Sequence, residues 1–384
     1  MTMSAPISKL RVLVVCPWFF AGDAVGAAAR DSVVAIRSLP NVTVSAIGTR
    51  NDYLDLDVEI ANDLPALLAS EVFLSADVII YHYAVFHEYF NALWLGNGTA
   101  QQIVRFHNVT PRRLMPKETW KIIDQSYEQL QAMANADEIW CDSVFNRMTL
   151  VEAGLNTDLI CVLPLAVRQP PFTTFSAKPK DGPINLLYVG RIAPSKGILD
   201  LVEAIGRIDL SALPPFILRI VGNLNFSSSE YARAVNDLIA AHGLGEKIAF
   251  VGTVDGSMLE SLYLETHILA LASYHEGFSV PVGEALRAGA IPITYNAGNL
   301  KRMAGGLGRT VQVGNIDELS VALAEVIQDA NSARANANAA VLRLDAGTFS
   351  AATFTAAAHI HMNEFTFEKL VDRIGARISK LNGI

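Results

Sequence analysis

The feature that most constrains the fold of this chain is the regular alternation of short, continuous apolar runs with segments of helical periodicity. Runs of Val, Ile and Leu that do not alternate with polar residues are typical of strands covered on both faces. Strands separated by helices predict right-handed βαβ units and parallel sheets. The predicted strands form a first set, Arg11–Cys16, Val42–Ile47, Asp77–Tyr81, Gln102–Phe106, Glu138–Trp140 and Ile160–Leu163, and a second set, Ile184–Val189, Phe216–Val221, Lys247–Val251, His267–Leu271, Ile291–Thr294 and Thr310–Val313.

Two sets of strands in 384 residues predict two domains. We expect an α/β protein with two Rossmann-like, doubly wound domains, residues 1–167 and 184–362, facing a central cleft. The proline-rich segment 168–183 is the predicted linker between them. Residues 363–384 carry the apolar stripe of an amphipathic helix, which packs either on its own domain or back on the first. A ligand site is expected at the carboxyl ends of the strands.

The composition excludes several classes of protein. A formal net charge of −8 argues against nucleic acid as a partner. Three widely spaced cysteines fit a reducing compartment and show no metal-ligand spacing. The apolar run 12–20 is interpreted as a buried first strand rather than a signal peptide, and no run is long enough to span a bilayer. We therefore expect a cytoplasmic protein.

Two glutamates, Glu276 and Glu284, flank a predicted helix N-terminus. They follow the apolar strand 267–271, and Pro281 between them is a residue common at the first position of a helix. A helix N-terminus presents unpaired N–H groups and partial positive charge, so it attracts phosphate. Carboxylates instead accept hydrogen bonds from hydroxyl groups such as those of sugars. The segment therefore suggests a site for a nucleotide-diphosphate sugar.

Two cations lie on the loop that follows the predicted strand 184–189. Arg191 and Lys196 are part of the sequence Gly190-Arg191-Ile192-Ala193-Pro194-Ser195-Lys196-Gly197, which leads into an amphipathic helix. Arginine offers a planar fork of donors and lysine a mobile point charge, so together they can hold a diphosphate.

Each motif also has a purely structural explanation. Loop cations are most often solvated, and Glu284 would be an ordinary surface residue if the helix bound nothing. The presence of both motifs in one predicted domain favours the ligand site. His275 lies beside Glu276, but no second histidine follows at the spacing of a metal site, so no metal is expected.

The second half of the chain, from about residue 184 to 323, resembles the retaining glycosyltransferases of family 4, which have the GT-B fold. The spacing of several short elements carries this resemblance. In chain order they are Gly190-Arg191, Lys196-Gly197, Gly222 after a strand, Glu276-Gly277-Phe278, Pro281, Glu284-Ala285 and Ala297-Gly298.

The resemblance implies roles for these residues. Arg191 and Lys196 would hold the donor diphosphate, Glu276 would contact the donor sugar, and Glu284 would bind the ribose. The other residues implied are Gly277, Phe278 and Ser279, whose backbone would hold sugar hydroxyls and phosphate, and Gly222, Thr253 and Val254 near the ribose and base.

Two positions depart from the pattern of the family. Gly283 replaces the bulky apolar residue that usually precedes the second glutamate, and Arg302 stands where the family often has a glutamate. These departures concern the detail of the base and sugar pocket rather than the class of enzyme.

The first half of the chain resembles the family more loosely. The loop that contains Gly22 is similar to the glycine loop that faces the donor phosphate, and it lacks the spacing of a dinucleotide site. The sequence Phe106-His107-Asn108-Val109-Thr110-Pro111 looks like an element of family members that build bacterial surface polysaccharides. The resemblance makes His107, together with Glu276, a candidate catalytic residue; the alternative is a structurally satisfied loop histidine. Residues 142–146 are interpreted as a structural helix cap.

We therefore expect a metal-independent, retaining glycosyltransferase without a cofactor. It would move a sugar from a UDP- or GDP-linked donor to a hydroxyl of a glycan or lipid-linked acceptor, in polysaccharide or glycoconjugate biosynthesis. A sugar-nucleotide epimerase of the same fold and a non-catalytic sugar-nucleotide-binding protein are the alternatives. The basic segment 111–121 is either a surface for peripheral contact with the inner face of the membrane or an ordinary charged helix. The oligomeric state is left open.

Overall fold

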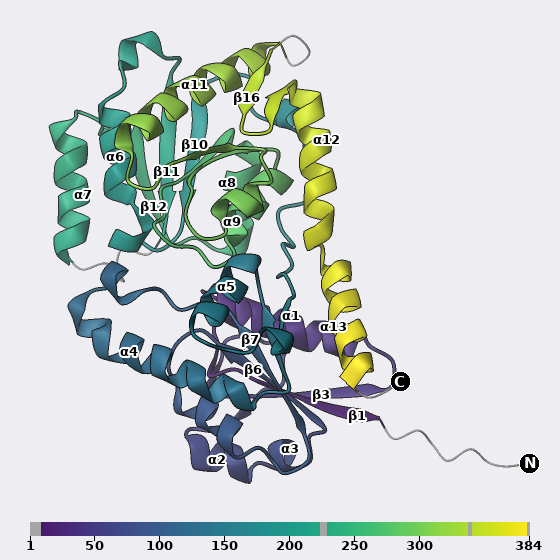
Figure 1. Ribbon diagram of the computed structural model, residues 1–384. Coiled ribbons are helices and arrows are strands. Elements are labelled where there is room, and N and C mark those ends of the chain that lie inside the picture. Colours follow the sequence, from purple (N-terminus) through teal and green to yellow (C-terminus); the bar gives the residue numbers. More distant parts are fainter. Residues whose placement is uncertain (1–8, 223–228, 337–339, 382–384) are drawn as a thin grey trace, which may run out of the picture. The chain divides into compact units, whose positions relative to one another are not determined.

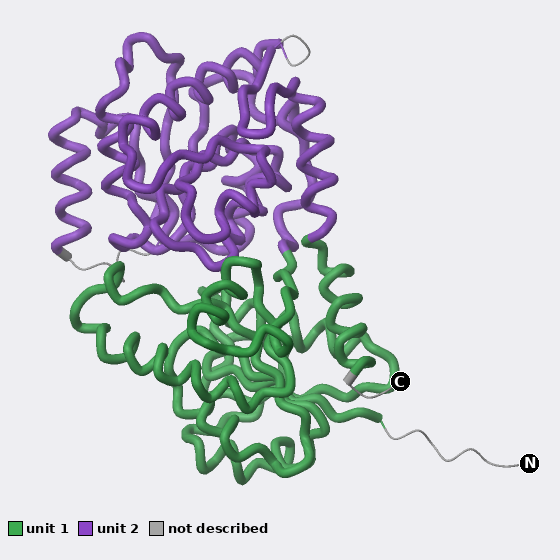
Figure 2. Tube along the Cα trace, viewed as in Figure 1, with its two compact units in different colours: residues 1–166, 365–384 green, residues 167–364 purple. Residues whose placement is uncertain are grey.

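The structure is a computed structural model that describes residues 9–222, 229–336 and 340–381. The chain divides into two compact units (Figure 2). Unit 1 comprises residues 1–166 and 365–384, and unit 2 comprises residues 167–364. Each unit is an α/β domain built around one main parallel sheet (Figure 1). The two Rossmann-like domains expected from the alternating pattern are therefore confirmed.

The main sheet of unit 1 has the strand order β5-β3-β1-β6-β7-β8-β9, and its paired strands run parallel. Its strands are buried apolar runs because helices or turns cover both faces. Leu13 and Ile79 belong to the core on one face, and Val14 and Ile80 to the core on the other. The strands are β1 (Leu10–Val15), β3 (Val42–Gly48), β5 (Glu59–Ile60), β6 (Val78–Tyr83), β7 (Gln101–Phe106), β8 (Glu138–Cys141) and β9 (Ile160–Val162), with a separate short pair β2 (Trp18–Phe19) and β4 (Arg50–Asn51).

The helices of unit 1 begin at recognisable caps. The side chain of Asp23 accepts hydrogen bonds from the backbone N–H groups of Val25 and Gly26 and so caps α1. Ser143 caps α5 in the same way, as the sequence predicts. The α-helices are α1 (Ala24–Arg37), α2 (Leu64–Ala69), α3 (Glu71–Leu74), α4 (Trp120–Gln129), α5 (Val144–Glu152) and the C-terminal α13 (Phe367–Leu381).

The main sheet of unit 2 has the strand order β12-β11-β10-β13-β14-β15, again with parallel pairs. In chain order this is 3-2-1-4-5-6, the arrangement of a doubly wound fold whose order reverses between its first and fourth strands. That switch point lies between β10 and β13. The strands are β10 (Ile184–Val189), β11 (Phe216–Val221), β12 (Ile248–Gly252), β13 (Ile268–Leu271), β14 (Ile291–Tyr295) and β15 (Arg309–Val311).

The helices of unit 2 connect these strands, and a short hairpin follows the longest of them. The helices are α6 (Ile198–Gly206), α7 (Ser229–Ala241), α8 (Gly256–Glu265), α9 (Val280–Arg287), α10 (Leu300–Ala304), α11 (Ile316–Ala335) and α12 (Ala351–Met362), and the hairpin is β16 (Leu342–Leu344) with β17 (Gly347–Phe349).

The proline-rich segment 168–183 packs against unit 2. Arg287 donates to the carbonyl oxygens of Arg168 and Pro170 and stacks over the ring of Phe172. The buried Lys178 donates to the carbonyl oxygens of residues 263 and 264 near the end of α8. Most of this segment is therefore a covering layer of unit 2.

The C-terminal helix α13 belongs to unit 1, whereas α12 belongs to unit 2. Its buried side chains Leu370, Ile374 and Ile378 join the core between α1 and the sheet of unit 1. The chain thus returns to its first unit at residue 365. Within the residues described, no helix is both long and apolar enough to cross a membrane.

Candidate functional site

The predicted donor residues of unit 2 gather at the switch point of its sheet. The loop with Arg191 and Lys196 follows β10, and the loop with Glu276 follows β13, the neighbouring strand. Ligands of doubly wound folds bind where the strand order reverses, at the carboxyl ends of the strands. The two motifs recognised in the sequence are therefore brought to the same place in the fold.

Lys196 and Glu276 are in direct contact. The Lys196 Nζ atom lies 2.5 Å from Oε1 of Glu276, and both side chains are mostly buried, with exposed fractions of 17% and 16%. Charged groups at such low exposure are normally paired. A ligand that uses Lys196 for phosphate and Glu276 for hydroxyl groups would therefore replace an ion pair.

Backbone contacts hold these loops close together. The N–H of Tyr274 donates to the carbonyl oxygen of Ser195, and the N–H of Asn299 donates to that of Glu276. Gly298 lies so close to Glu276 that an added Cβ would be 2.1 Å from the Glu276 carbonyl oxygen. The predicted Ala297-Gly298 element therefore fits as a close packing partner of the Glu276 loop.

Two helices of unit 2 begin at this edge without a side-chain cap. The N-caps of α6 and α9 are Gly197 and Ser279, both in the left-handed conformation; Gly197 has no side chain, and the side chain of Ser279 accepts no hydrogen bond from its helix. By contrast, Asp255 caps α8. Uncapped N-terminal N–H groups are ready donors for a phosphate or a sugar oxygen.

Ser279 has a second feature that points to a ligand. It is 5% exposed, and its Oγ atom has no hydrogen-bond partner among the described residues. Its φ of 73° is unusual for a residue with a side chain. A buried hydroxyl at an uncapped helix N-terminus is a donor and acceptor that a bound molecule would satisfy.

Glu284 lies in the second turn of α9 in a different environment. Burial raises the pKa of its carboxyl group to about 7, an effect that the nearby Tyr263 hydroxyl opposes only in part. The two glutamates therefore differ: one is paired with a lysine, and the other exchanges a proton near neutral pH.

The remaining donor-side residues lie along the same edge of the sheet. Arg191 is exposed, and it and Glu276 both act electrostatically on the buried Tyr188, in opposite directions. Gly222 follows β11, where an added Cβ would be 2.0 Å from the carbonyl oxygen of Gly190. Thr253 is exposed and Val254 half-buried on the loop after β12, the edge strand.

In unit 1, His107 is the centre of a buried polar chain. Its Nδ1 lies 2.6 Å from Oδ2 of Asp142, and its Nε2 lies 2.9 Å from Nδ1 of His82. The other oxygen of Asp142 accepts from Nε of Arg105. The side chains of Arg105, His107 and Asp142 are at most 4% exposed.

The donors and acceptors of this chain follow from its partners. Asp142, as a carboxylate, only accepts, so Nδ1 of His107 carries a proton. Burial, with smaller effects of His107 and Arg105, lowers the pKa of His82 well below its ordinary value, so His82 is neutral. Nδ1 of His82 faces Nε2 of His107, and Nε2 of His82 is left without a partner among the described residues. A substrate group could bind His107 through nitrogen only by displacing His82.

The loop of Gly22 differs from the helix starts of unit 2. Gly22 is exposed and directly precedes Asp23, whose carboxylate already occupies the N-terminus of α1. The helix after Gly22 thus offers fewer unpaired N–H groups than α6 or α9.

Several site residues were not found from the sequence. From the sequence, Asp142 is assigned to a helix cap and Arg105 to a predicted strand, and His82 is given no role. Each stands at or near the carboxyl end of a predicted strand, and that position is the signal that could have identified them.

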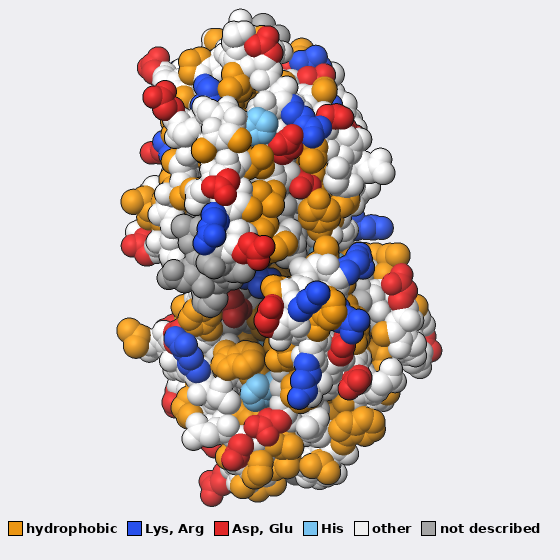
Figure 3. Space-filling view, turned by 90° about the vertical axis from the view of Figure 1, so that its left-hand side faces the viewer, with side chains coloured by type: hydrophobic (Ala, Val, Ile, Leu, Met, Phe, Trp, Pro, Cys, Tyr) orange, Lys and Arg blue, Asp and Glu red, His pale blue; other side chains and the backbone are white. Residues whose placement is uncertain are grey.

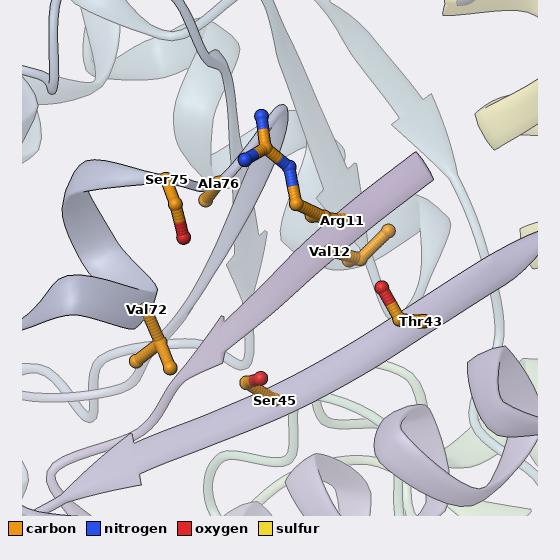
Figure 4. A pocket seen from close by; sticks show the side chains of 7 residues that line it. All are labelled: Arg11, Val12, Thr43, Ser45, Val72, Ser75 and Ala76. Carbon is orange, nitrogen blue, oxygen red and sulfur yellow. The ribbon is translucent and has the colours of Figure 1, made fainter. Parts of the chain in front are cut away.

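A separate hollow of about 200 Å³ lies at the opposite edge of the unit 1 sheet. Figure 4 shows it between β1, β3 and the turn after α3. Arg11 lines it, but the guanidinium is already bound to Asp77 in a bidentate pair. Because this is the amino-terminal edge of the strands, it is distinct from the sites described above.

The basic segment 111–121 has partners of its own. Arg112 pairs with Asp124 and lies over the ring of Trp120. On the face shown in Figure 3, acidic, basic and hydrophobic side chains are interspersed.

Within the described part of the chain, no group of three or more His, Cys, Asp or Glu side chains is arranged to hold a metal ion.

Comparison with known families gives a match over part of the chain. Residues 172–342 match the family model described as glycosyl transferases group 1. This range contains all the donor-side residues of unit 2 discussed above and most of that unit.

Curated relatives align mainly over short regions. A glycogen synthase of Mycobacterium tuberculosis is 31% identical over 123 residues, 32% of this chain and 28% of its own length. A GDP-mannose:cellobiosyl-diphosphopolyprenol alpha-mannosyltransferase of Xanthomonas oryzae is 30% identical over 128 residues, 33% of this chain and 32% of its own length. The alignments with these relatives thus span about a third of their length.

Solved structures match nearly the whole chain. Sucrose-phosphate synthase from Thermosynechococcus elongatus has a TM-score of 0.73 at 18% identity, covering 97% of this chain and 99% of the other. Anabaena HepE in complex with UDP-glucose has a TM-score of 0.69 at 15% identity, covering 96% and 99%. At these identities the likeness establishes the fold, which is GT-B.

Proposed function

We propose, from the premise that this chain carries a glycosyl transferases group 1 domain on a GT-B fold, that it is a retaining glycosyltransferase. It would use a nucleotide-diphosphate sugar as donor and a hydroxyl of a glycan or lipid-linked molecule as acceptor. The observation that carries this proposal is the contact between Lys196 and Glu276 at the switch point of unit 2, beside two uncapped helix N-termini. HepE, which matches the fold, was solved with UDP-glucose, so UDP-sugars are the first donors to test, with GDP-sugars next.

In this proposal the cations stabilise the leaving group. Lys196 would exchange Glu276 for the diphosphate, Arg191 would bind it from the exposed side, and the N–H groups at the start of α9 would add partial positive charge. Charge that is already in place lowers the barrier where negative charge develops. No metal would be needed for this role.

The released Glu276 would accept hydrogen bonds from the donor sugar, and Glu284 from the ribose. The base would lie near Gly222, Thr253 and Val254. During transfer, the bond between C1 of the sugar and the diphosphate oxygen breaks, and the bond between C1 and the acceptor oxygen forms on the same face. The acceptor proton passes to the departing diphosphate.

Unit 1 would hold the acceptor in this proposal. His107 would contact a sugar or acceptor hydroxyl by giving up its bond to His82, while Asp142 keeps the ring in place. Gly22 would lie beside the donor phosphate. The segment 111–121 would be the contact surface if the acceptor is linked to lipid.

A thermal-shift panel of UDP-, GDP- and ADP-sugars, with Mg²⁺ and with EDTA, tests the donor site. A donor at 100 times its Kd stabilises the folded protein by about 2.7 kcal/mol. Arg191→Ala and Lys196→Ala should abolish most of the shift. Lys247→Ala, at the amino-terminal end of β12, should retain it. Equal shifts in all three variants would refute the placement of the diphosphate.

Incubation of the stabilising donor with and without hydroxyl acceptors then tests the reaction. Transfer with an α-linked product from an α-linked donor, seen by NMR, supports retention. Conversion of the donor without any acceptor would identify an epimerase, and binding without turnover would identify a non-catalytic binding protein.

A further inference from the structure

Asp200, at the start of α6, binds the loop that carries Glu276 and the end of β14. Its Oδ2 atom accepts hydrogen bonds from the hydroxyls of Tyr274, at 2.5 Å, and Tyr295, at 2.6 Å. The two rings meet edge to face with centroids 5.6 Å apart. One carboxylate oxygen thus binds side chains from the loop after β13 and from the end of β14.

The chain positions of these residues link them to the ion pair. Asp200 lies in the first turn of α6, four residues after Lys196, and Tyr274 lies two residues before Glu276. The Tyr274 backbone N–H also donates to Ser195, the residue before Lys196. Tyr274 is therefore tied at its backbone and at its hydroxyl to the segment that carries Lys196.

The two tyrosine hydroxyls of this bridge keep their protons. Burial, with the carboxylate of Asp200 as a further cause, raises the pKa of both tyrosine hydroxyls, so they remain donors. Hydrogen bonds to a charged acceptor are shorter and stronger than neutral ones. The bridge therefore restrains the loop of Glu276 more than contact between rings alone.

We propose that Asp200 and Tyr274 are positioning residues that set the distance between Lys196 and the carboxylate of Glu276. This rests on the proposed function, because it assigns Lys196 to the diphosphate and Glu276 to the sugar. Loss of the bridge lets the Glu276 loop move while Lys196 stays in place on the loop before α6. Loss of the bridge therefore weakens binding of the sugar and leaves binding of the nucleotide unchanged.

The test compares the Kd values of matched pairs by calorimetry: UDP with UDP-glucose, GDP with GDP-mannose, and ADP with ADP-glucose. For the pair that wild-type protein binds, Tyr274→Phe should weaken the sugar conjugate about tenfold more than the diphosphate, since small displacements at such sites have large effects. Asp200→Ala should do the same, and Asp200→Asn, which retains an acceptor oxygen, should recover part of the loss.

Tyr295→Phe is the matched control, because it removes a hydrogen bond to the same oxygen from the end of β14 and retains both the Tyr295 ring and the bond from Tyr274 on the Glu276 loop. Its ratio of the two Kd values should stay within about twofold of wild type, and melting temperatures of all variants check folding. An unchanged ratio in Tyr274→Phe, or an equal change in Tyr274→Phe and Tyr295→Phe, would overturn the positioning role alone. A wild-type protein that binds none of the three pairs would overturn the proposed function, and this inference with it.

Discussion

Among the single residues of the site, the two glutamates have opposite electrostatic surroundings. Glu276 faces an ammonium group, whereas Glu284 is half-buried on α9, with a pKa raised from 4.5 to about 7. Between these values the native state holds a proton that the unfolded chain has released. Glu284 therefore favours folding at low pH, and its contribution is lost as the pH rises through about 7.

We predict that nucleotide affinity rises with pH in the same range. In the proposed function ribose hydroxyls would donate to Glu284 and so favour its ionised form; with a pKa of about 7, the ionised fraction grows about tenfold between pH 6 and pH 8. Calorimetry at both values, in buffers of different ionisation enthalpy, should show a lower Kd at pH 8 and proton release on binding. Glu284→Gln should flatten the dependence; an equal slope in that variant would show that another group is responsible.

Unit 1 contains one buried and one exposed Arg–Asp pair. Asp142 lies against the fully buried Arg105, so Asp142→Asn leaves a buried cation without its counter-charge and should destabilise the protein by roughly 3–5 kcal/mol. Asp124→Asn breaks the exposed pair with Arg112 and should cost at most about 1 kcal/mol. Urea denaturation of both variants provides the measurement. Similar midpoints for the two would contradict the importance of burial.

For the structural elements, the packing of α9 explains one departure from the family pattern. A Cβ added at Gly283 would lie 2.5 Å from Cε of Met303 on α10 and 3.0 Å from Cε of Met362 on α12. The helix that carries Glu284 thus packs closely on two other helices. A bulky residue before the second glutamate does not fit here.

We predict that Gly283→Ala destabilises the protein by about 1–3 kcal/mol, because the added methyl forces neighbouring side chains to move. The same change should lower nucleotide affinity, since it shifts α9 and Glu284. Gly256→Ala at the exposed start of α8 is the control: no atom lies within 4 Å of its added Cβ. That variant should be neutral or slightly stabilised. Chemical denaturation measures the stability of the two variants, and the thermal shift with donor measures their nucleotide affinity. Equal losses in Gly283→Ala and Gly256→Ala would contradict this account.

The long and the short strands of this chain were predictable to different degrees. Each continuous apolar run became a strand of a parallel sheet, because burial on both faces requires such a composition. The edge strand β5, the pair β2 and β4, and the hairpin of β16 and β17 were not predicted. They are two or three residues long, so their pairing depends on tertiary contacts and leaves no periodic signal.

Over the whole molecule, the assignment of α13 to unit 1 makes the stability of that unit depend on a helix that follows all of unit 2 in the sequence. Ile374 is fully buried in the core between α1 and the sheet. Ile374→Ala should therefore cost roughly 2–5 kcal/mol. Hydrogen exchange should accelerate in α1, β1 and α13 while the amides of unit 2 keep their protection. Ser379→Ala, on the exposed side of α13, should change neither. Faster exchange throughout both units would contradict this division.

The candidate site was predictable where it consists of short motifs and not where it joins distant ones. Lys196 and Glu276 could be found because each stands beside glycines after a strand. Their direct contact, 80 residues apart in sequence, depends on the neighbouring positions of β10 and β13. Likewise, His107 was visible in its motif, but its bonds to His82 and Asp142 come from three different strands or strand ends.

Because Lys196 and Glu276 neutralise each other, a ligand binds favourably only if it compensates both side chains. If inorganic phosphate bound Lys196 alone, the poorly solvated carboxylate of Glu276 would lose its partner. A simple anion is therefore expected to bind weakly. A molecule that carries an anion and a hydroxyl-bearing ring together compensates both partners at once. Under the proposed function, the nucleotide that remains after sugar transfer would compensate only Lys196, and re-formation of the ion pair would favour its release.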